Sequence, residues 1–409
     1  MDTQRTEKDL GINPGLLRWA RERAGLSLED AAVRAGLKGL KPRGQKKGVD
    51  PATLLRLFED GQKSISWAQL IRVAKAYRRP PLTFFLSSPP VEPVMPPDLR
   101  TMGHRPPDHL SPEFQEFYTY LVSIHDTLRD ILEQEGGARL PFVGGVSVAT
   151  PVLRVVQSMR DILDFSLEAQ QRVRNGEDLF SALRAKAHAA GIFVIAGKGL
   201  DPRHPVTADE FRGMAFCDPV APLVVVNTAD VKAARVFTLV HEFAHVWLGQ
   251  SALSGFDPLS PGRDRHTPSE IFADQVAAEF LVPESQMRLF HAETGAVTWE
   301  NLAEGSRRFK VSRAVMARRA LDLGILSSDI YRGWMSRLAM EWTAREQRIK
   351  ERMREQESAV SWTRQIQSRL GKKVLQTISE GISVGVLNAR DASAVLRVRQ
   401  DGLGRLLSP

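Results

Sequence analysis

Residues 241–245 read His-Glu-Phe-Ala-His, and residues 233–240 before them read Ala-Ala-Arg-Val-Phe-Thr-Leu-Val. The preceding run has no Pro or Gly and repeats apolar residues at helical spacing, so it predicts a helix that continues through both histidines. Positions i and i+4 of a helix share one face, which lets both imidazoles reach one metal ion. Glu242 follows the first histidine, where it can take a proton from a metal-bound water. The stretch therefore predicts a zinc site suited to peptide-bond hydrolysis.

A catalytic zinc ion takes three protein ligands and keeps one position for water, so a third ligand must come from another element. The segment 268–283 opens with helix-start residues and ends at a proline, which predicts a second helix. Glu270 and Asp274 are four residues apart and share a face of it. We assign Glu270 as the third ligand and Asp274 as the acceptor for the N–H of a ligating histidine.

Two other residues compete for the third position. Glu279 lies nine residues beyond Glu270, which is about 180° around the helix axis, so both carboxylates cannot face one ion. His266 lies in a polar loop that contains Gly and Pro, where an imidazole is more often solvated than bound to metal.

These residues also carry a family resemblance. The motif at 241–245, followed by Glu-x-x-Ala-Asp-x-Val-Ala-Ala-x-Phe-Leu-Val-Pro at 270–283, is similar to the ImmA/IrrE family of zinc metallopeptidases. Residues 211–227 and 309–321 match further motifs of that family in its order, and the resemblance covers roughly residues 175–332. Val276 stands where the family usually has Phe, a packing change that does not touch the metal.

The resemblance implies a zincin-like domain with a small sheet beside the metal helix. In the family, the two histidines and the later glutamate bind Zn²⁺ and the glutamate of the motif is the base. The resemblance therefore implies that His241, His245 and Glu270 bind the metal and that Glu242 is the base. The resemblance also implies a selective endopeptidase that cleaves a small transcriptional repressor. Cleavage would derepress genes for stress response, mobile-element transfer or anti-phage defence.

The composition is ordinary for a globular protein, with 409 residues, 43 % apolar and 25 % charged, which suggests two or three domains. No apolar run approaches the length of a membrane span and residues 1–8 lack the apolar core of a secretory signal, so we expect no membrane partner. One cysteine excludes an internal disulfide framework and favours a reducing, cytoplasmic setting.

Positive charge is concentrated at the start of the chain. Residues 1–88 contain 17 Lys and Arg against 9 Asp and Glu, whereas the whole chain contains 56 against 48. The entire formal excess of +8 therefore lies in the first 88 residues. This asymmetry favours a module that faces nucleic acid over a basic surface kept for solubility.

The basic segment predicts five short helices, which begin near Pro14, Ser27, Asp50, Ser66 and Pro80. The set resembles the Cro/repressor type of helix-turn-helix domain. The stretches 58–61 and 79–86 are typical of such domains fused to ImmA/IrrE peptidases.

Two departures from that type argue against the recognition of specific DNA bases by this domain. The turn between the second and third helices spans residues 37–49, far more than the usual few. The third helix has no Asn or Gln to read adenine. Phosphate contacts, which hold DNA without reading it, suit the available side chains better; the candidate contacts are Lys38, Lys41, Arg43, Lys46, Lys47 and Arg56. We predict DNA binding of low sequence specificity; the alternative is a repressor-like domain kept for docking or dimerisation.

Residues 89–113 contain eight prolines and predict an extended linker. The predicted order is a helix-turn-helix domain (1–88), this linker, a metallopeptidase domain (114–332) and a helical C-terminal segment (333–409). The predicted fold class is α+β and mostly helical.

The single cysteine, Cys217, lies in a predicted strand over residues 211–218, just before the zinc helix. A thiolate there could fill the water position on the metal and inhibit the enzyme. The alternative is an ordinary buried cysteine. Alternation along the strand places Cys217 on the face of Gly213 and Ala215, so inhibition requires that this face point to the metal.

Two functions of different class follow. In the first, the chain is a cytoplasmic zinc endopeptidase in which Glu242 activates water and then protonates the leaving amine. Its partners are a repressor substrate and DNA, with single-stranded DNA as a candidate trigger. In the second, the chain is a non-catalytic regulator that binds DNA or a repressor and keeps the peptidase fold. The sequence leaves the oligomeric state open.

Overall fold

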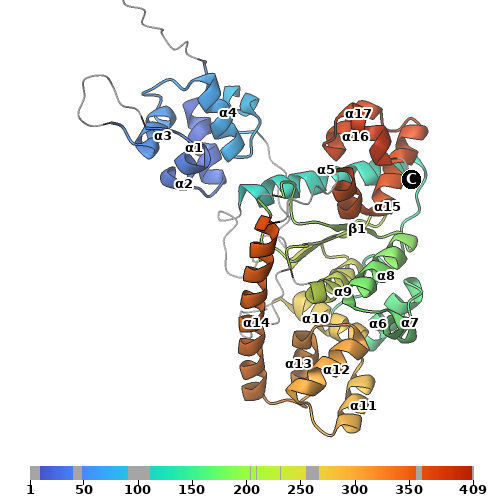
Figure 1. Ribbon diagram of the computed structural model, residues 1–409. Coiled ribbons are helices and arrows are strands. Elements are labelled where there is room, and N and C mark those ends of the chain that lie inside the picture. The colour runs from blue at the N-terminus through green and yellow to red at the C-terminus, as the bar shows by residue number, and fades with distance from the viewer. Residues whose placement is uncertain are drawn as a thin grey trace, which may run out of the picture. The chain divides into compact units, whose positions relative to one another are not determined.

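The computed structural model describes residues 10–39, 48–90, 111–202, 204–208, 210–230, 232–254, 267–355 and 362–407. Helices dominate and surround one small sheet (Figure 1), which confirms the α+β, mostly helical class. The chain divides into two compact units. The first contains the described residues up to 90 with residues 111–119, 199–202 and 204, and the second contains the sheet and most of the other helices.

The first unit is built of short helices that begin where the sequence predicts. They are α1 (Pro14–Arg23), α2 (Leu28–Arg34), α3 (Pro51–Glu59), α4 (Trp67–Ala76) and the 3-10 helix η1 (Pro81–Phe85). The side chains of Asn13, Ser27, Asp50 and Ser66 accept N–H groups in the first turns of the four α-helices. The five predicted helices are therefore confirmed.

An ion pair is buried in the apolar core of the first unit. Arg21 donates from Nε and NH2 to the two carboxylate oxygens of Glu59 at 2.7 and 3.0 Å. The hydrogen bond to Glu59 raises the pKa of Arg21 against the opposing effect of burial. Leu17 of α1 and Leu54 of α3 are fully buried in one hydrophobic cluster, so the pair and the apolar contacts together join the two helices.

The sheet of the second unit has the strand order β1-β3-β2-β4. Its strands are β1 (Phe193–Ala196), β2 (Gly213–Phe216), β3 (Leu223–Val226) and β4 (Ala252–Ser254). β3 is parallel to β1 and antiparallel to β2, and β2 is antiparallel to β4. Every residue of β2 and β3 is buried, as expected for inner strands covered by helices.

The remaining helices belong to the second unit, except that residues 112–119 of α5 belong to the first. They are α5 (Pro112–Gln134), α6 (Val152–Ile162), α7 (Leu167–Arg172), α8 (Gly176–Ala189), α9 (Lys232–Leu248), α10 (Pro268–Leu281), α11 (Glu284–Thr294), α12 (Trp299–Phe309), α13 (Arg313–Asp322), α14 (Ser328–Glu355), α15 (Trp362–Ser383), α16 (Ala389–Leu396) and α17 (Gln400–Leu407). No described helix is long and apolar enough to cross a membrane.

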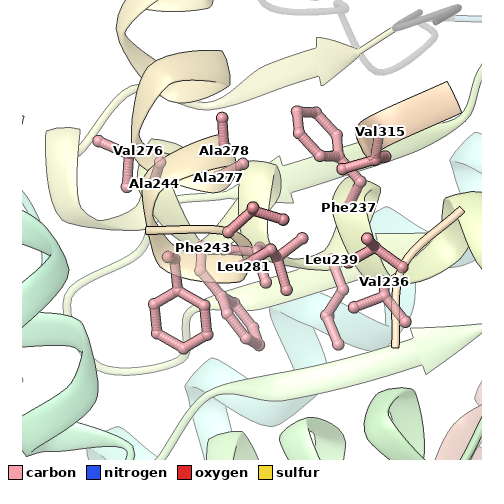
Figure 2. Close-up of a cluster of buried hydrophobic side chains, with 14 of the residues drawn as sticks. Val236, Phe237, Leu239, Phe243, Ala244, Val276, Ala277, Ala278, Leu281 and Val315 are labelled. Atoms are coloured by element: carbon pink, nitrogen blue, oxygen red, sulfur yellow. The ribbon is translucent and has the colours of Figure 1, made fainter. Parts of the chain in front are cut away.

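Helix α9 lies between the sheet and helix α10, and contacts both. Phe243 and Ala244 of α9 meet Ala277 and Leu281 of α10 in the buried cluster that Figure 2 shows. The small side chains at 244 and 277 allow the two helices to pack closely, and close packing sets how their polar side chains meet.

One guanidinium joins the C-terminal helices to the sheet. Gly371 interrupts α15 with φ 79° and ψ 166°, and the carbonyls of Ser368 and Arg369 just before it accept hydrogen bonds from Arg184 of α8, both at 2.9 Å. Arg184 also donates to the carbonyl of Val194 in β1 at 3.0 Å. Burial lowers the pKa of Arg184 to about 10, and the charge remains in place at neutral pH.

Arg184→Met is expected to destabilise the packing of α15 on the second unit by about 1.5–3 kcal/mol, because three backbone carbonyls lose a charged donor. Hydrogen exchange of the α15 amides in the full chain measures the effect. Arg174→Met is the matched control, since Arg174 is 86 % exposed and pairs with Asp178 on the surface. Equal protection in the two variants would contradict the role of Arg184.

Candidate metal centre

Two helices supply the side chains of the predicted site. Helix α9 carries His241, Glu242 and His245, and helix α10 carries Glu270 and Asp274. The N-cap Thr267 accepts the N–H of Glu270 through its side-chain oxygen, with Pro268 at the first helical position, which is the helix start that the sequence predicts.

The structure brings three potential ligands together. The Nε2 atoms of His241 and His245 lie 3.1 Å apart. The two carboxylate oxygens of Glu270 lie 3.2 Å from these Nε2 atoms, one from each. Ligands at about 2.0–2.1 Å from a tetrahedral zinc ion lie roughly 3.3 Å from one another. The donor set and its spacing therefore fit Zn²⁺, and these three residues form one candidate metal group among the described residues.

Asp274 supports the first histidine. Its Oδ1 lies 3.1 Å from Nδ1 of His241, an arrangement that holds the imidazole with Nε2 turned toward the metal position. Burial lowers the pKa of His241, but the hydrogen bonds to Asp274 and Glu270 outweigh it and raise that pKa well above its ordinary value. The pKa of Glu270 falls instead, because the two imidazoles outweigh the effect of its burial. The site thus concentrates negative charge that a cation can neutralise.

Asp274→Ala is expected to weaken zinc binding by about 10–100-fold, since the orientation of His241 and the basicity of its Nε2 depend on this carboxylate. Competition with a chromogenic chelator measures the affinity. Asp161→Ala is the control, because Asp161 bonds Gln157 on the exposed side of α6. An unchanged dissociation constant for the Asp274 variant would show that the imidazole is held by packing alone.

Comparison with known families agrees with this geometry. Residues 200–321 match the family model described as the IrrE N-terminal-like domain, a peptidase family, and residues 15–83 match a helix-turn-helix domain. The chain joins a helix-turn-helix domain to an IrrE N-terminal-like peptidase domain. The family resemblance of the sequence is thereby confirmed. No curated protein matches the chain.

Helix α10 of the IrrE-like domain is held at its C-terminal end by three other elements. The carbonyls of Phe280, Leu281 and Val282 accept hydrogen bonds from Arg160 of α6, Gln170 of α7 and Arg319 of α13. These carbonyls have no partner within their own helix, and the two cations also favour the negative end of its dipole. The sequence did not reveal this capping, because the donors lie 37 to 120 residues away.

The competing carboxylate of the IrrE-like domain is engaged elsewhere. Glu279 pairs with Arg319 and accepts the N–H of Glu284 at the start of α11. It is absent from the candidate metal group of the described residues, as its place on the far side of α10 predicts. The other rival, His266, lies outside the described residues.

Cys217 follows β2, and its thiol donates to the carbonyl of His245 at 3.2 Å. Burial, together with the charge of Glu242, raises the pKa of this thiol, so it stays protonated at neutral pH. The candidate metal group of the described residues does not contain its sulfur. The geometry thus supports an ordinary, partly buried cysteine packed against the core and gives no support to an inhibitory ligand.

The DNA-contact candidates are only partly described. Lys38 precedes the undescribed part of the long turn, and Arg56 lies on α3; both side chains are exposed. The others, Lys41, Arg43, Lys46 and Lys47, lie outside the described residues.

Proposed function

We propose that the protein is a zinc-dependent endopeptidase that cleaves a transcriptional repressor at a specific bond. Cleavage would derepress genes for stress response, mobile-element transfer or anti-phage defence. The observation that carries the proposal is the convergence of His241, His245 and Glu270, with Glu242 beside them on α9. A peptidase family match over the same residues supports it.

In this proposal, His241, His245 and Glu270 would hold zinc, which would act as a Lewis acid toward the scissile carbonyl and the attacking water. Asp274 keeps the tautomer of His241 in which Nε2 is free to bind. Glu242 accepts a proton from the attacking water and later donates it to the nitrogen of the leaving amine. Glu242 is fully buried on α9, one residue after the ligand His241.

A cleft supports a polypeptide substrate. It has a volume of about 930 Å³, and its wall includes Asp274 and Phe237, which both contact His241. Leu153 and Ile271, which are 68 % and 46 % exposed, also line it. Exposed apolar side chains in a cleft that is bordered by Asp274 suit the apolar side chains of a bound chain.

DNA is the proposed regulator. The helix-turn-helix match and the positive charge of residues 1–88 support DNA binding. Because no residue of α3 suits adenine recognition, we propose that the protein responds to DNA of any sequence, and that single-stranded DNA stimulates cleavage.

The test uses the zinc-loaded full chain and small repressors encoded next to its gene. Intact-mass analysis should find one cleaved bond in one repressor. A chelator should stop cleavage and added zinc should restore it. Parallel reactions contain single-stranded DNA, duplex DNA of the same sequence, or no DNA. If no neighbouring repressor is cut in any reaction, the proposal of a repressor-cleaving peptidase is wrong. Equal cleavage rates in the three reactions would refute only the proposal that DNA stimulates cleavage.

A further inference from the structure

Gly213, the first residue of β2, lies directly across from Glu242. A Cβ atom placed on Gly213 would lie 2.2 Å from Oε1 and 2.8 Å from Cδ of Glu242. It would also lie 2.6 Å from Cγ2 of Thr238, one helical turn earlier on α9. The carboxylate and the methyl group therefore occupy the space that any side chain at position 213 would need.

The backbone does not account for this glycine. Gly213 is not among the described glycines with positive φ, so an alanine would meet no conformational strain. It pairs with Val226 of β3 on one side and with Ser254 of β4 on the other. Glycine weakens the interior of a strand and there commonly marks a close approach by another group. The approaching group here is Glu242.

The start of β2 is held firmly. The backbone N–H of Asn227 donates to the carbonyl of Arg212 at 2.8 Å, and its buried side chain donates to the carbonyl of Phe211 at 3.0 Å. Arg212 also pairs with Asp230 at 2.9 Å, with both side chains largely buried. The strand therefore resists displacement at the residues just before Gly213.

Helix α9 resists displacement as well. Val240 and Phe243, on either side of the His-Glu pair, are fully buried in the core, and His241 is tied to α10 through Glu270 and Asp274. With both backbones held, a side chain at 213 would act first on the side-chain torsions of Glu242.

We propose that Gly213 is a positioning residue for the general base: by having no side chain, it leaves the space that the Glu242 carboxylate occupies against β2. The inference rests on the proposed function. It predicts that a single methyl group at 213 moves the base while leaving the three metal ligands in place.

The first measurement compares Gly213→Ala with Gly333→Ala, whose added Cβ would meet nothing within 4 Å. Both variants should bind one zinc ion with wild-type affinity. The Gly213 variant should lose about 100-fold in kcat with KM unchanged, because a shift of roughly 1 Å at the reacting centre costs about that much. Wild-type kcat in this variant, or a loss explained by zinc release, would overturn the proposal.

The second measurement is a double-mutant cycle of the melting temperature, Tm, which needs no substrate. Gly213→Ala should lower Tm by about 5 °C in the wild-type background, the usual cost of overpacking. The same change should cost less beside Glu242→Ala, which removes the contact with the carboxylate and leaves the contact with Thr238. Equal costs in the two backgrounds would mean that the cost arises in the strand or at Thr238 and not through Glu242, which would overturn the proposal.

The cycle also covers a variant that does not fold. If Gly213→Ala fails to fold and the double variant folds, the coupling is demonstrated; if both fail, the proposal is wrong. A wild-type protein that cleaves no repressor but shows the coupling would refute the proposed function and leave the packing relation intact.

Discussion

Glu242→Gln is expected to lower kcat for repressor cleavage by about 10²–10⁴-fold while the protein still binds one zinc ion. The amide has the shape of the carboxylate but cannot accept the proton of the attacking water. Glu242 is also absent from the candidate metal group of the described residues, so metal content should not change. Timed cleavage and zinc analysis of the purified variant measure the two effects.

Glu300→Gln is the matched control, because Glu300 is exposed on α12, outside the ligand group and the cleft lining. The same pair of variants separates the two functional classes in cells. If Glu242→Gln abolishes derepression and Glu300→Gln does not, the peptidase activity causes the derepression. If derepression persists in both variants, the protein acts as a non-catalytic regulator that binds DNA or a repressor.

Arg319→Ala is expected to destabilise the packing of α10 against α13 by about 3–5 kcal/mol, because Glu279 would remain largely buried without its cation. The Arg319 side chain is 9 % exposed and that of Glu279 is 12 % exposed. The change also removes the donor to the carbonyl of Val282. Hydrogen exchange of the α10 and α13 amides in the full chain measures the loss.

Arg318→Ala is the control at the neighbouring position. Arg318 pairs with Asp322 on a more open surface, with side chains 34 % and 38 % exposed, so about 0–1 kcal/mol is expected. Replacing Arg319 and Glu279 together by Leu should cost less than Arg319→Ala, since no charge is then left buried. Equal losses for Arg318→Ala and Arg319→Ala would contradict the buried ion pair.

Local signals in the sequence determined much of the site. The spacing of His241 and His245 follows from the helical period, as does the shared face of Glu270 and Asp274. Helix starts were predictable for the same reason, because a cap such as Ser27 bonds a backbone N–H only three residues away. Each of these features depends on residues within one or two turns, and the chain itself brings such residues together.

Only the tertiary structure decided which helices and strands meet. The strand order β1-β3-β2-β4 and the capping of α10 by Arg160, Gln170 and Arg319 join residues far apart in the chain. The surroundings of the Cys217 thiol are of this kind: alternation put it on the face of Gly213, and packing placed α9 against that face, with the sulfur at the His245 carbonyl. Spacing along one element determines which side chains share a face. The neighbour of that face is determined only when apolar surfaces pack, and this packing places the carboxylate of Glu242 against Gly213.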